Sequence, residues 1–257
     1  MSKKILFAAV TILLFISMSL TAFAADSKSW YCKRNSEHKQ PTLDADMRFI
    51  EQYGGYYVDY KHGDNCTDKV VYLTFDAGYE NGNVAKILDV LAEKQVKGAF
   101  FVLGHLIEEN TSLVVRMADE GHLVCNHTNN HPDMSRKSTL EEFKAEIVAL
   151  EDIYREKTGR ELSKFFRPPE GRFSRQTLEF ANELGYKTVF WSFAYADWDN
   201  NAQMSHDAAK KKILDNIHNG AIILLHPTSA TNAAILGEVI DELRAQGYRF
   251  GTLEELV

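Results

Sequence analysis

Acidic and basic side chains recur in this sequence at the ends of short apolar runs. Asp76 follows the apolar run 70–75 and precedes Gly78, a placement that suits a general base. Arg167 follows the apolar pair 165–166, and an arginine facing a carboxylate would keep it ionised. Other ionisable residues follow other apolar runs, namely His127, His131, Asp197 and His226. We therefore expect these side chains to share one site of acid–base chemistry.

His127 and His131 are four residues apart, so on one helical turn both imidazoles would reach the same ion. Zinc accepts neutral imidazole nitrogen and keeps an open coordination position in catalytic sites. A histidine pair at this spacing also occurs by chance on protein surfaces. Its place after an apolar run and before Pro132 favours a metal site.

The other residues have structural alternatives. Asp76 would cap the helix that follows it, as aspartate commonly does. Arg167 would be an ordinary surface arginine, and His226 would be a core histidine on an apolar run. The arrangement of the secondary structure decides between these interpretations.

Short runs rich in β-branched and aromatic residues alternate with helix-compatible stretches, which predicts βαβ units and a parallel sheet. These runs are 70–75, 99–103, 122–125, 165–166, 188–191, 221–225 and 248–250. Their number suits a small α/β barrel. Because the carboxyl ends of parallel strands form one rim, where active sites lie, we expect the ionisable residues to meet there.

Composition is that of a globular protein, with 257 residues, of which 45% are hydrophobic and 25% charged. The 29 basic and 36 acidic residues give a net charge of −7 without a basic stripe, so nucleic acid is not an expected partner. No glycine-rich phosphate loop follows the first strand, which argues against a nucleotide-binding fold.

Residues 1–24 have the pattern of a secretory signal peptide: a basic start, a 16-residue apolar run and a final Ala22-Phe23-Ala24. The run is shorter than the ~20 residues of a permanent span, and an uncleaved anchor is the alternative. We expect a secreted, extracytoplasmic protein without a permanent membrane span. Residues 25–68 form a polar and aromatic wrapping segment, and residues 69–257 form the main domain.

Three cysteines remain in the mature chain. In an oxidising compartment Cys32 and Cys66 would pair, and in a reducing one all three would stay free. Cys125 lies in an apolar run, where a buried thiol is expected.

The residues above resemble, in order and spacing, the polysaccharide deacetylases, the NodB-homology enzymes of carbohydrate esterase family 4. The motifs within residues 69–257 are Thr74-Phe75-Asp76-x-Gly78, His127-Thr128-x-x-His131, Arg167-Pro168-Pro169-x-Gly171, Asp197-Trp198 and Leu225-His226. Trp30-Tyr31 and the segments 74–82 and 191–194 are similar to the sporulation branch that deacetylates N-acetylmuramic acid in peptidoglycan. The resemblance implies a distorted (β/α) barrel of about seven strands and metal-dependent hydrolysis of an N-acetyl group.

The resemblance also implies roles for individual residues. Asp76 would be the base that activates water, and Arg167 would orient it. Asp197 would pair with His226, the acid that protonates the departing amine. The backbone N–H of Glu170 would help the metal to stabilise the oxyanion.

His127 and His131 would hold the divalent metal, most often zinc in this family. Ala77 stands where the family usually has an aspartate as third ligand, and a methyl group binds no cation. Weakened metal affinity is therefore expected, with water, substrate or an amide such as Asn81 or Asn126 completing the shell.

Substrate contacts are expected from Trp198, Glu170 and Arg172, the last as a cation for the carboxylate of muramic acid. The branch implies action on peptide-free glycan strands of the cell wall or forespore intermembrane space, leading to the muramic δ-lactam of spore cortex. One alternative is deacetylation of N-acetylglucosamine in peptidoglycan or chitooligosaccharides. Another is a non-catalytic glycan-binding protein, which only Ala77 favours.

Overall fold

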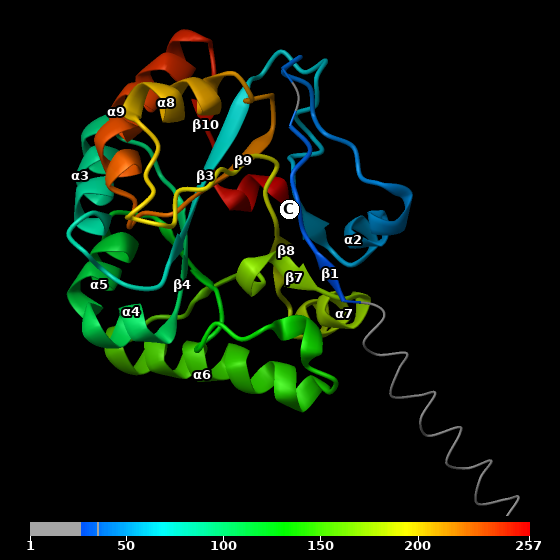
Figure 1. Cartoon of the computed structure of the whole chain (residues 1–257). Helices are drawn as coiled ribbons and strands as arrows, with labels where there is room; N and C mark the ends of the chain where they lie inside the picture. Colours follow the sequence, from blue (N-terminus) through cyan, green and yellow to red (C-terminus); the bar gives the residue numbers. More distant parts are fainter. Residues whose placement is uncertain (1–26, 35) are drawn as a thin grey trace, which may run out of the picture.

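Parallel strands curled into a half-barrel form the centre of the protein in a computed structural model that describes residues 27–34 and 36–257 (Figure 1). All of the strands expected from the sequence are present. They are β3 (Val70–Ala77), β4 (Ala99–Val102), β5 (Leu123–Asn126), β6 (Ser163–Phe166), β8 (Lys187–Val189), β9 (Ala221–Leu225) and β10 (Arg249–Phe250). Every pairing among them is parallel. The predicted α/β barrel architecture is confirmed.

A further short strand, β2 (Gly55–Tyr56), lies parallel to β8 at the edge of the sheet. Beyond β8 the chain turns towards β9, where the Ser192 N–H donates to the Ile222 carbonyl at 3.0 Å. The Leu224 N–H in turn donates to the Phe193 carbonyl at 2.9 Å. These contacts bring the two sides of the sheet around a common centre.

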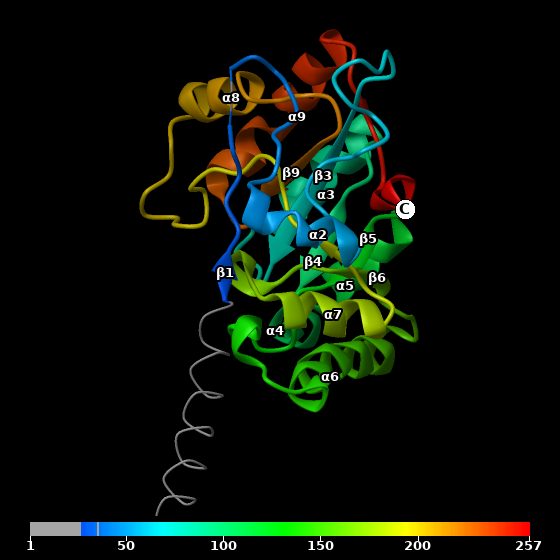
Figure 2. The same cartoon turned by 90° about the vertical axis from the view of Figure 1, so that its right-hand side faces the viewer.

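Helices cover the outer face of the half-barrel (Figures 1 and 2). They are α3 (Val84–Lys94), α4 (Gly104–Glu109), α5 (Thr111–Asp119), α6 (Leu140–Thr158), α7 (Arg175–Glu183), α8 (His206–Leu214) and α9 (Ala230–Ala245). Short 3-10 turns are η1 (Ala45–Met47), η2 (Met134–Arg136), η3 (Pro169–Gly171) and η4 (Leu253–Leu256). An apolar cluster between sheet and helices forms the larger core.

The alternation of side chains along β3 explains why its polar residues face inward. Leu73 and Phe75 belong to the core between sheet and helices, whereas Tyr72 packs inside the half-barrel. Successive residues of a strand point to opposite faces, so Thr74 and Asp76 lie on the same face as Tyr72. This register sends the Asp76 carboxylate to the centre of the rim.

The segment before β3 runs over the side of the half-barrel away from α3 (Figures 1 and 2). It contains β1 (Lys28–Ser29), which pairs antiparallel with β7 (Arg172–Phe173), and α2 (Phe49–Gln52). Its aromatic residues pack with those of β7 and the end of β8 in a separate apolar cluster.

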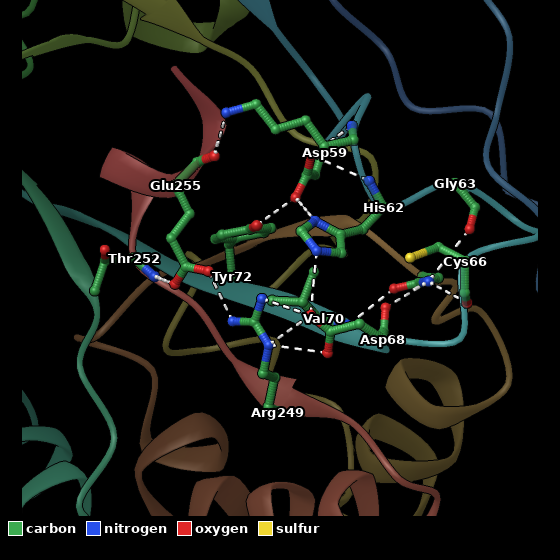
Figure 3. A network of polar contacts seen from close by, with 12 residues as sticks. Asp59, His62, Gly63, Cys66, Asp68, Val70, Tyr72, Arg249, Thr252 and Glu255 are labelled. Carbon is green, nitrogen blue, oxygen red and sulfur yellow. Dashed lines mark hydrogen bonds and ion pairs between the residues drawn. The ribbon is translucent and has the colours of Figure 1, made fainter.

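A polar network fastens this segment to the amino-terminal end of the half-barrel (Figure 3). Asp59 is fully buried and accepts hydrogen bonds from the Tyr72 hydroxyl and, at 2.6 Å, from His62 Nδ1. Arg249 pairs with Asp68 at 2.9 Å and with Glu255 at 2.7 Å. The network closes the end of the half-barrel opposite to the carboxyl ends of the strands.

All three cysteines are free thiols, so the Cys32–Cys66 disulfide is absent and the reduced alternative describes the structure. Cys125 is fully buried inside the half-barrel, as expected. Within the described residues no helix has the length and apolar character needed to cross a membrane. The predicted signal peptide lies outside the described residues.

Candidate active site

A cleft of about 780 Å³ opens at the carboxyl ends of the strands. The predicted site residues in its wall are Asp76, His127, His131, Glu170, Trp198 and His226. Arg167 and Asp197 lie buried behind it, with 0% and 1% of their surface exposed. Residues separated by up to 150 positions are therefore brought together at one rim, as the positions after the strands predict.

Arg167 holds the Asp76 carboxylate from below. Its Nη1 donates to Asp76 Oδ1 at 2.8 Å and its Nη2 to the Thr74 hydroxyl at 2.9 Å. The guanidinium lies over the Phe101 ring, 4.2 Å from the centroid. Burial is the largest single influence and would raise the pKa of Asp76, but Arg167, His127 and His226 together outweigh it and hold that pKa below its usual value. Asp76 is thus an ionised carboxylate facing the cleft.

His127 and His131 lie side by side with ring centroids 5.1 Å apart. His127 Nδ1 lies 2.8 Å from the Arg167 carbonyl, which can only accept, so Nδ1 carries the proton. Nε2 then points its lone pair toward the cleft, 3.5 Å from Asp76 Oδ2. Burial lowers the pKa of His127 to about 4, so the imidazole is neutral, the form that binds metals.

The spacing of the two histidines predicts a helical turn between them, but the structure has none there. Residues 127–131 form a loop in which Thr128 and His131 have positive φ angles of 74° and 59°. The Thr128 hydroxyl accepts from the His131 N–H at 3.0 Å and stabilises this loop. The loop brings both rings to the same part of the cleft by a different backbone path.

Asp197 and His226 form a hydrogen-bonded pair on the cleft. His226 Nδ1 lies 2.7 Å from Asp197 Oδ1, and the His226 backbone N–H donates to Asp197 Oδ2 at 2.8 Å. Burial alone would lower the pKa of His226, but the bond to Asp197 and its charge prevail and raise that pKa. With Nδ1 engaged, Nε2 is the nitrogen left to donate a proton into the cleft.

The remaining predicted contacts lie around the rim. Trp198 is 60% exposed, and its ring centroid is 6.0 Å from that of His226. Glu170 has a φ of 54° in η3. Arg172 lies beside the cleft rather than in its lining, with Nε 2.9 Å from Glu170 Oε2 and Nη1 3.2 Å from Asp133 Oδ2. Its charge is already matched by two carboxylates.

The sequence matches the family described as polysaccharide deacetylase over residues 63–189. It is 39% identical over 230 residues to the peptidoglycan-N-acetylmuramic acid deacetylase PdaA of Bacillus subtilis, covering 89% of this chain and 85% of that protein. The chain belongs to the polysaccharide deacetylase family. The deacetylase is therefore an amide hydrolase, and Asp76 and His226 both lie in the wall of one cleft.

Solved structures support the same assignment. The structure of Bacillus subtilis PdaA, described as a family 4 carbohydrate esterase, superimposes on the deacetylase with a TM-score of 0.83 at 38% identity, over 90% of this chain and 96% of that one. The peptidoglycan-N-acetylglucosamine deacetylase PgdA of Listeria monocytogenes is 36% identical over 191 residues, 74% of this chain and 39% of that protein.

Enzymes of this family are generally metal-dependent, and the deacetylase has two imidazoles in the cleft wall that could bind a metal. Within residues 27–34 and 36–257 no group of three His, Cys, Asp or Glu side chains is placed to hold one. Ala77 is fully buried in the core between sheet and helices. The Asn126 side-chain amide is already hydrogen-bonded: its Nδ2 donates to the Ile147 carbonyl at 3.0 Å, and its Oδ1 accepts from the Thr128 N–H at 2.9 Å. His127 and His131 are therefore the predicted ligands whose side chains both face the cleft.

Some residues of the deacetylase site give no signal in the sequence. Asn232, in the first turn of α9, donates from Nδ2 to Asp197 Oδ2 at 2.6 Å and accepts from the Tyr195 hydroxyl. Because a carboxylate can only accept, this contact fixes which end of the amide faces Asp197. Tyr79 and Trp191 also line the cleft. An asparagine near a helix start is ordinarily a capping residue, so the pattern alone could not identify its contact with Asp197.

Proposed function

We propose that this deacetylase removes the acetyl group from N-acetylmuramic acid in peptide-free peptidoglycan glycan strands, outside the cytoplasm. The observation that carries the proposal is the likeness to the muramic acid deacetylase, which extends over most of the chain and includes the segment before β3. The cleft supplies the base and the acid that such a hydrolysis requires.

The protons move between residues on the cleft. Asp76 takes a proton from water as the water oxygen attacks the acetyl carbonyl carbon. The carbon–nitrogen bond then breaks, and His226 gives its proton to the departing nitrogen. Acetate and a free amine leave. Arg167 keeps the base ionised, and Asp197 keeps the acid protonated before the reaction.

His127 and His131 would hold the metal, zinc being the simplest choice for imidazole ligands. When bound, the ion supplies a Lewis acid for the acetyl carbonyl. The backbone N–H of Glu170 would donate to the developing oxyanion. Since Ala77 provides no third ligand, metal affinity is expected to be weak.

The substrate groove would use the exposed indole of Trp198 and the rim at Glu170. The new amine lies near the lactyl carboxylate of the same muramic acid, so the product can close to the muramic δ-lactam of spore cortex. The protein would then act in the cell wall or forespore intermembrane space. Arg172 already pairs with Glu170 and Asp133, so it would bind the lactyl carboxylate of the substrate while these two ion pairs persist. Charge reversal at Arg172 should then raise KM for muramoyl glycans and leave chitin oligomers unaffected.

Deacetylation of N-acetylglucosamine is the second candidate, because relatives such as the Listeria enzyme bear that name and the motifs do not select the sugar. A non-catalytic glycan-binding role is favoured only by Ala77. The buried Arg167 under Asp76 and the Asp197–His226 pair argue for catalysis, since a protein that only binds glycans needs no acid–base pair.

The test is mass spectrometry of glycan strands, with and without stem peptides, after incubation with the full chain and zinc. Acetyl loss from muramic acid on peptide-free strands is expected. Loss from glucosamine alone would replace the proposed substrate by the second candidate. Asp76→Asn and His226→Gln should each lower kcat by about 10²–10⁴. His105→Gln, at an exposed position on α4, is the matched control and should leave kcat unchanged.

A further inference from the structure

Trp30, in the segment before β3, lies directly behind the catalytic cleft. Its backbone N–H donates to the Gly171 carbonyl at 2.8 Å, and its indole Nε1 donates to the Trp191 carbonyl at 2.9 Å. Its ring stacks on Phe190 with centroids 4.7 Å apart. Only 8% of its surface is exposed. One residue thus joins the loop after β6 to the segment after β8.

The segment that Trp30 holds is also the support of Arg167. Arg167 Nε donates to the Val189 carbonyl at 2.9 Å, and Nη2 donates to the Phe190 carbonyl at 3.2 Å. Three successive carbonyls, at 189, 190 and 191, are therefore fixed by Arg167 and Trp30 together. A shift of this segment would move the guanidinium that orients Asp76.

The loop that contains Gly171 packs closely against Trp30 and Trp191. Gly171 has a φ of 66°, and a Cβ there would lie 2.9 Å from the Trp191 ring and 3.0 Å from the Trp30 Cβ. β1 pairs with β7 immediately after this glycine. Trp30 therefore lies between two parts of the cleft wall, Glu170 and Trp191.

We propose that Trp30 is a positioning residue of the deacetylase, which fixes the Trp191 wall and the carbonyls that hold Arg167. The segment before β3 is then part of the catalytic unit and not only a cover for the half-barrel. If Trp30 had only a structural role, it would contribute no more than any other aromatic residue of the same apolar cluster. What separates the two roles is the indole N–H bond to the segment that holds Arg167.

The kinetic test compares Trp30→Phe with Phe49→Leu in the full chain. Phe49 belongs to the same apolar cluster, is 6% exposed, and has no side-chain donor that could bond to the carbonyls of residues 189–191. Trp30→Phe keeps an aromatic ring and removes the N–H donor. We expect KM for the glycan to rise about threefold and kcat to fall about tenfold in Trp30→Phe only.

KM is the decisive quantity in this comparison. A smaller folded fraction lowers the apparent kcat but leaves KM unchanged, so a merely structural role predicts an unchanged KM in both variants. An unchanged KM in Trp30→Phe, whether or not kcat falls, would overturn the proposal, and so would equal changes in both variants.

A second measurement does not depend on the substrate, since the kinetic test rests on the proposed function. Hydrogen–deuterium exchange of peptides covering residues 168–173 and 189–193 should quicken about tenfold in Trp30→Phe and remain at wild-type rates in Phe49→Leu. Unchanged exchange in these peptides would overturn the proposal even if no glycan is deacetylated. If Trp30→Phe fails to fold, Trp30→His, which retains a ring N–H, is compared with Trp30→Leu by the same exchange measurement. Equal exchange in the two would count against the role of the N–H bond.

Discussion

Replacing Arg167 by methionine tests whether one buried guanidinium holds Asp76, the proposed base. Methionine retains the length of the side chain and its packing over Phe101. It leaves the Asp76 carboxylate and the Thr74 hydroxyl without their donor at 2.8 and 2.9 Å. Removing one partner of a buried ion pair costs about 3–5 kcal/mol of folding free energy. For a chain of this size the midpoint of thermal unfolding should fall by about 6–20 °C.

This loss of stability should depend on pH in a defined direction. In the wild type the folded pKa of Asp76 is lowered, so its stabilisation is fully present above the unfolded pKa of about 3.9 and is lost as pH falls through the folded pKa. In Arg167→Met the largest contribution that lowers this pKa is lost, so burial should outweigh the smaller effects of His127 and His226 and raise the folded pKa above the unfolded one. The difference between the two proteins should then be largest at neutral pH and shrink as the solution is acidified.

Urea denaturation followed by circular dichroism at pH 7.5, 6 and 5 measures this difference, because the other carboxylates contribute equally to both proteins. The double variant Arg167→Met, Asp76→Asn should regain much of the lost stability at pH 7.5. Arg249→Met is the control, since this arginine is 40% exposed and such pairs contribute about 0–1 kcal/mol. A loss of stability that is the same at every pH, or that the double variant does not relieve, would refute the reasoning.

Three further outcomes are expected. Asn232→Leu should lower kcat about tenfold with little change in KM, because Asn232 anchors the partner of His226; unaltered steady-state kinetics would contradict this. Burial lowers the pKa of His122 to about 4 in the folded protein, whereas an unfolded histidine titrates near about 6.5. Between these pH values only the unfolded chain takes up a proton, so the free energy of unfolding falls by up to about 3 kcal/mol on acidification. His122→Asn, which keeps an acceptor for the Gly98 N–H, should abolish that loss in denaturation at pH 7 and 4.5. Mild dialysis should leave metal well below one ion per chain, with activity restored by zinc, whereas stoichiometric metal retained against a chelator would disprove weak binding by two imidazoles.

The positions of the site residues could be predicted because they follow from simple periodicity. Strands rich in β-branched and aromatic residues alternate with helices, and parallel strands place their carboxyl ends at one rim. Asp76, Arg167 and His226 therefore meet although 150 residues separate the first from the last. The alternation along β3 also places the carboxylate on the inner face.

Other features depend on contacts that no local pattern encodes. The spacing of His127 and His131 predicts a helical turn, yet the loop reaches the same proximity through two residues with positive φ. β2 is two residues long, too short for alternation to mark it. The contact of Asn232 with Asp197 and that of Trp30 with Trp191 depend on how distant segments pack, which composition and spacing do not specify.

The tryptophans of this chain are also gathered at one place. There are three, and Trp191 and Trp198 line the cleft while Trp30 is bonded to the Trp191 carbonyl. The ring of Trp198 lies 6.0 Å from that of His226, close enough for protonation of the imidazole to alter its emission. The tryptophan emission of the protein therefore comes from the cleft and the wall behind it. We expect glycan binding and the charge state of His226 to be measurable by fluorescence in the unlabelled chain.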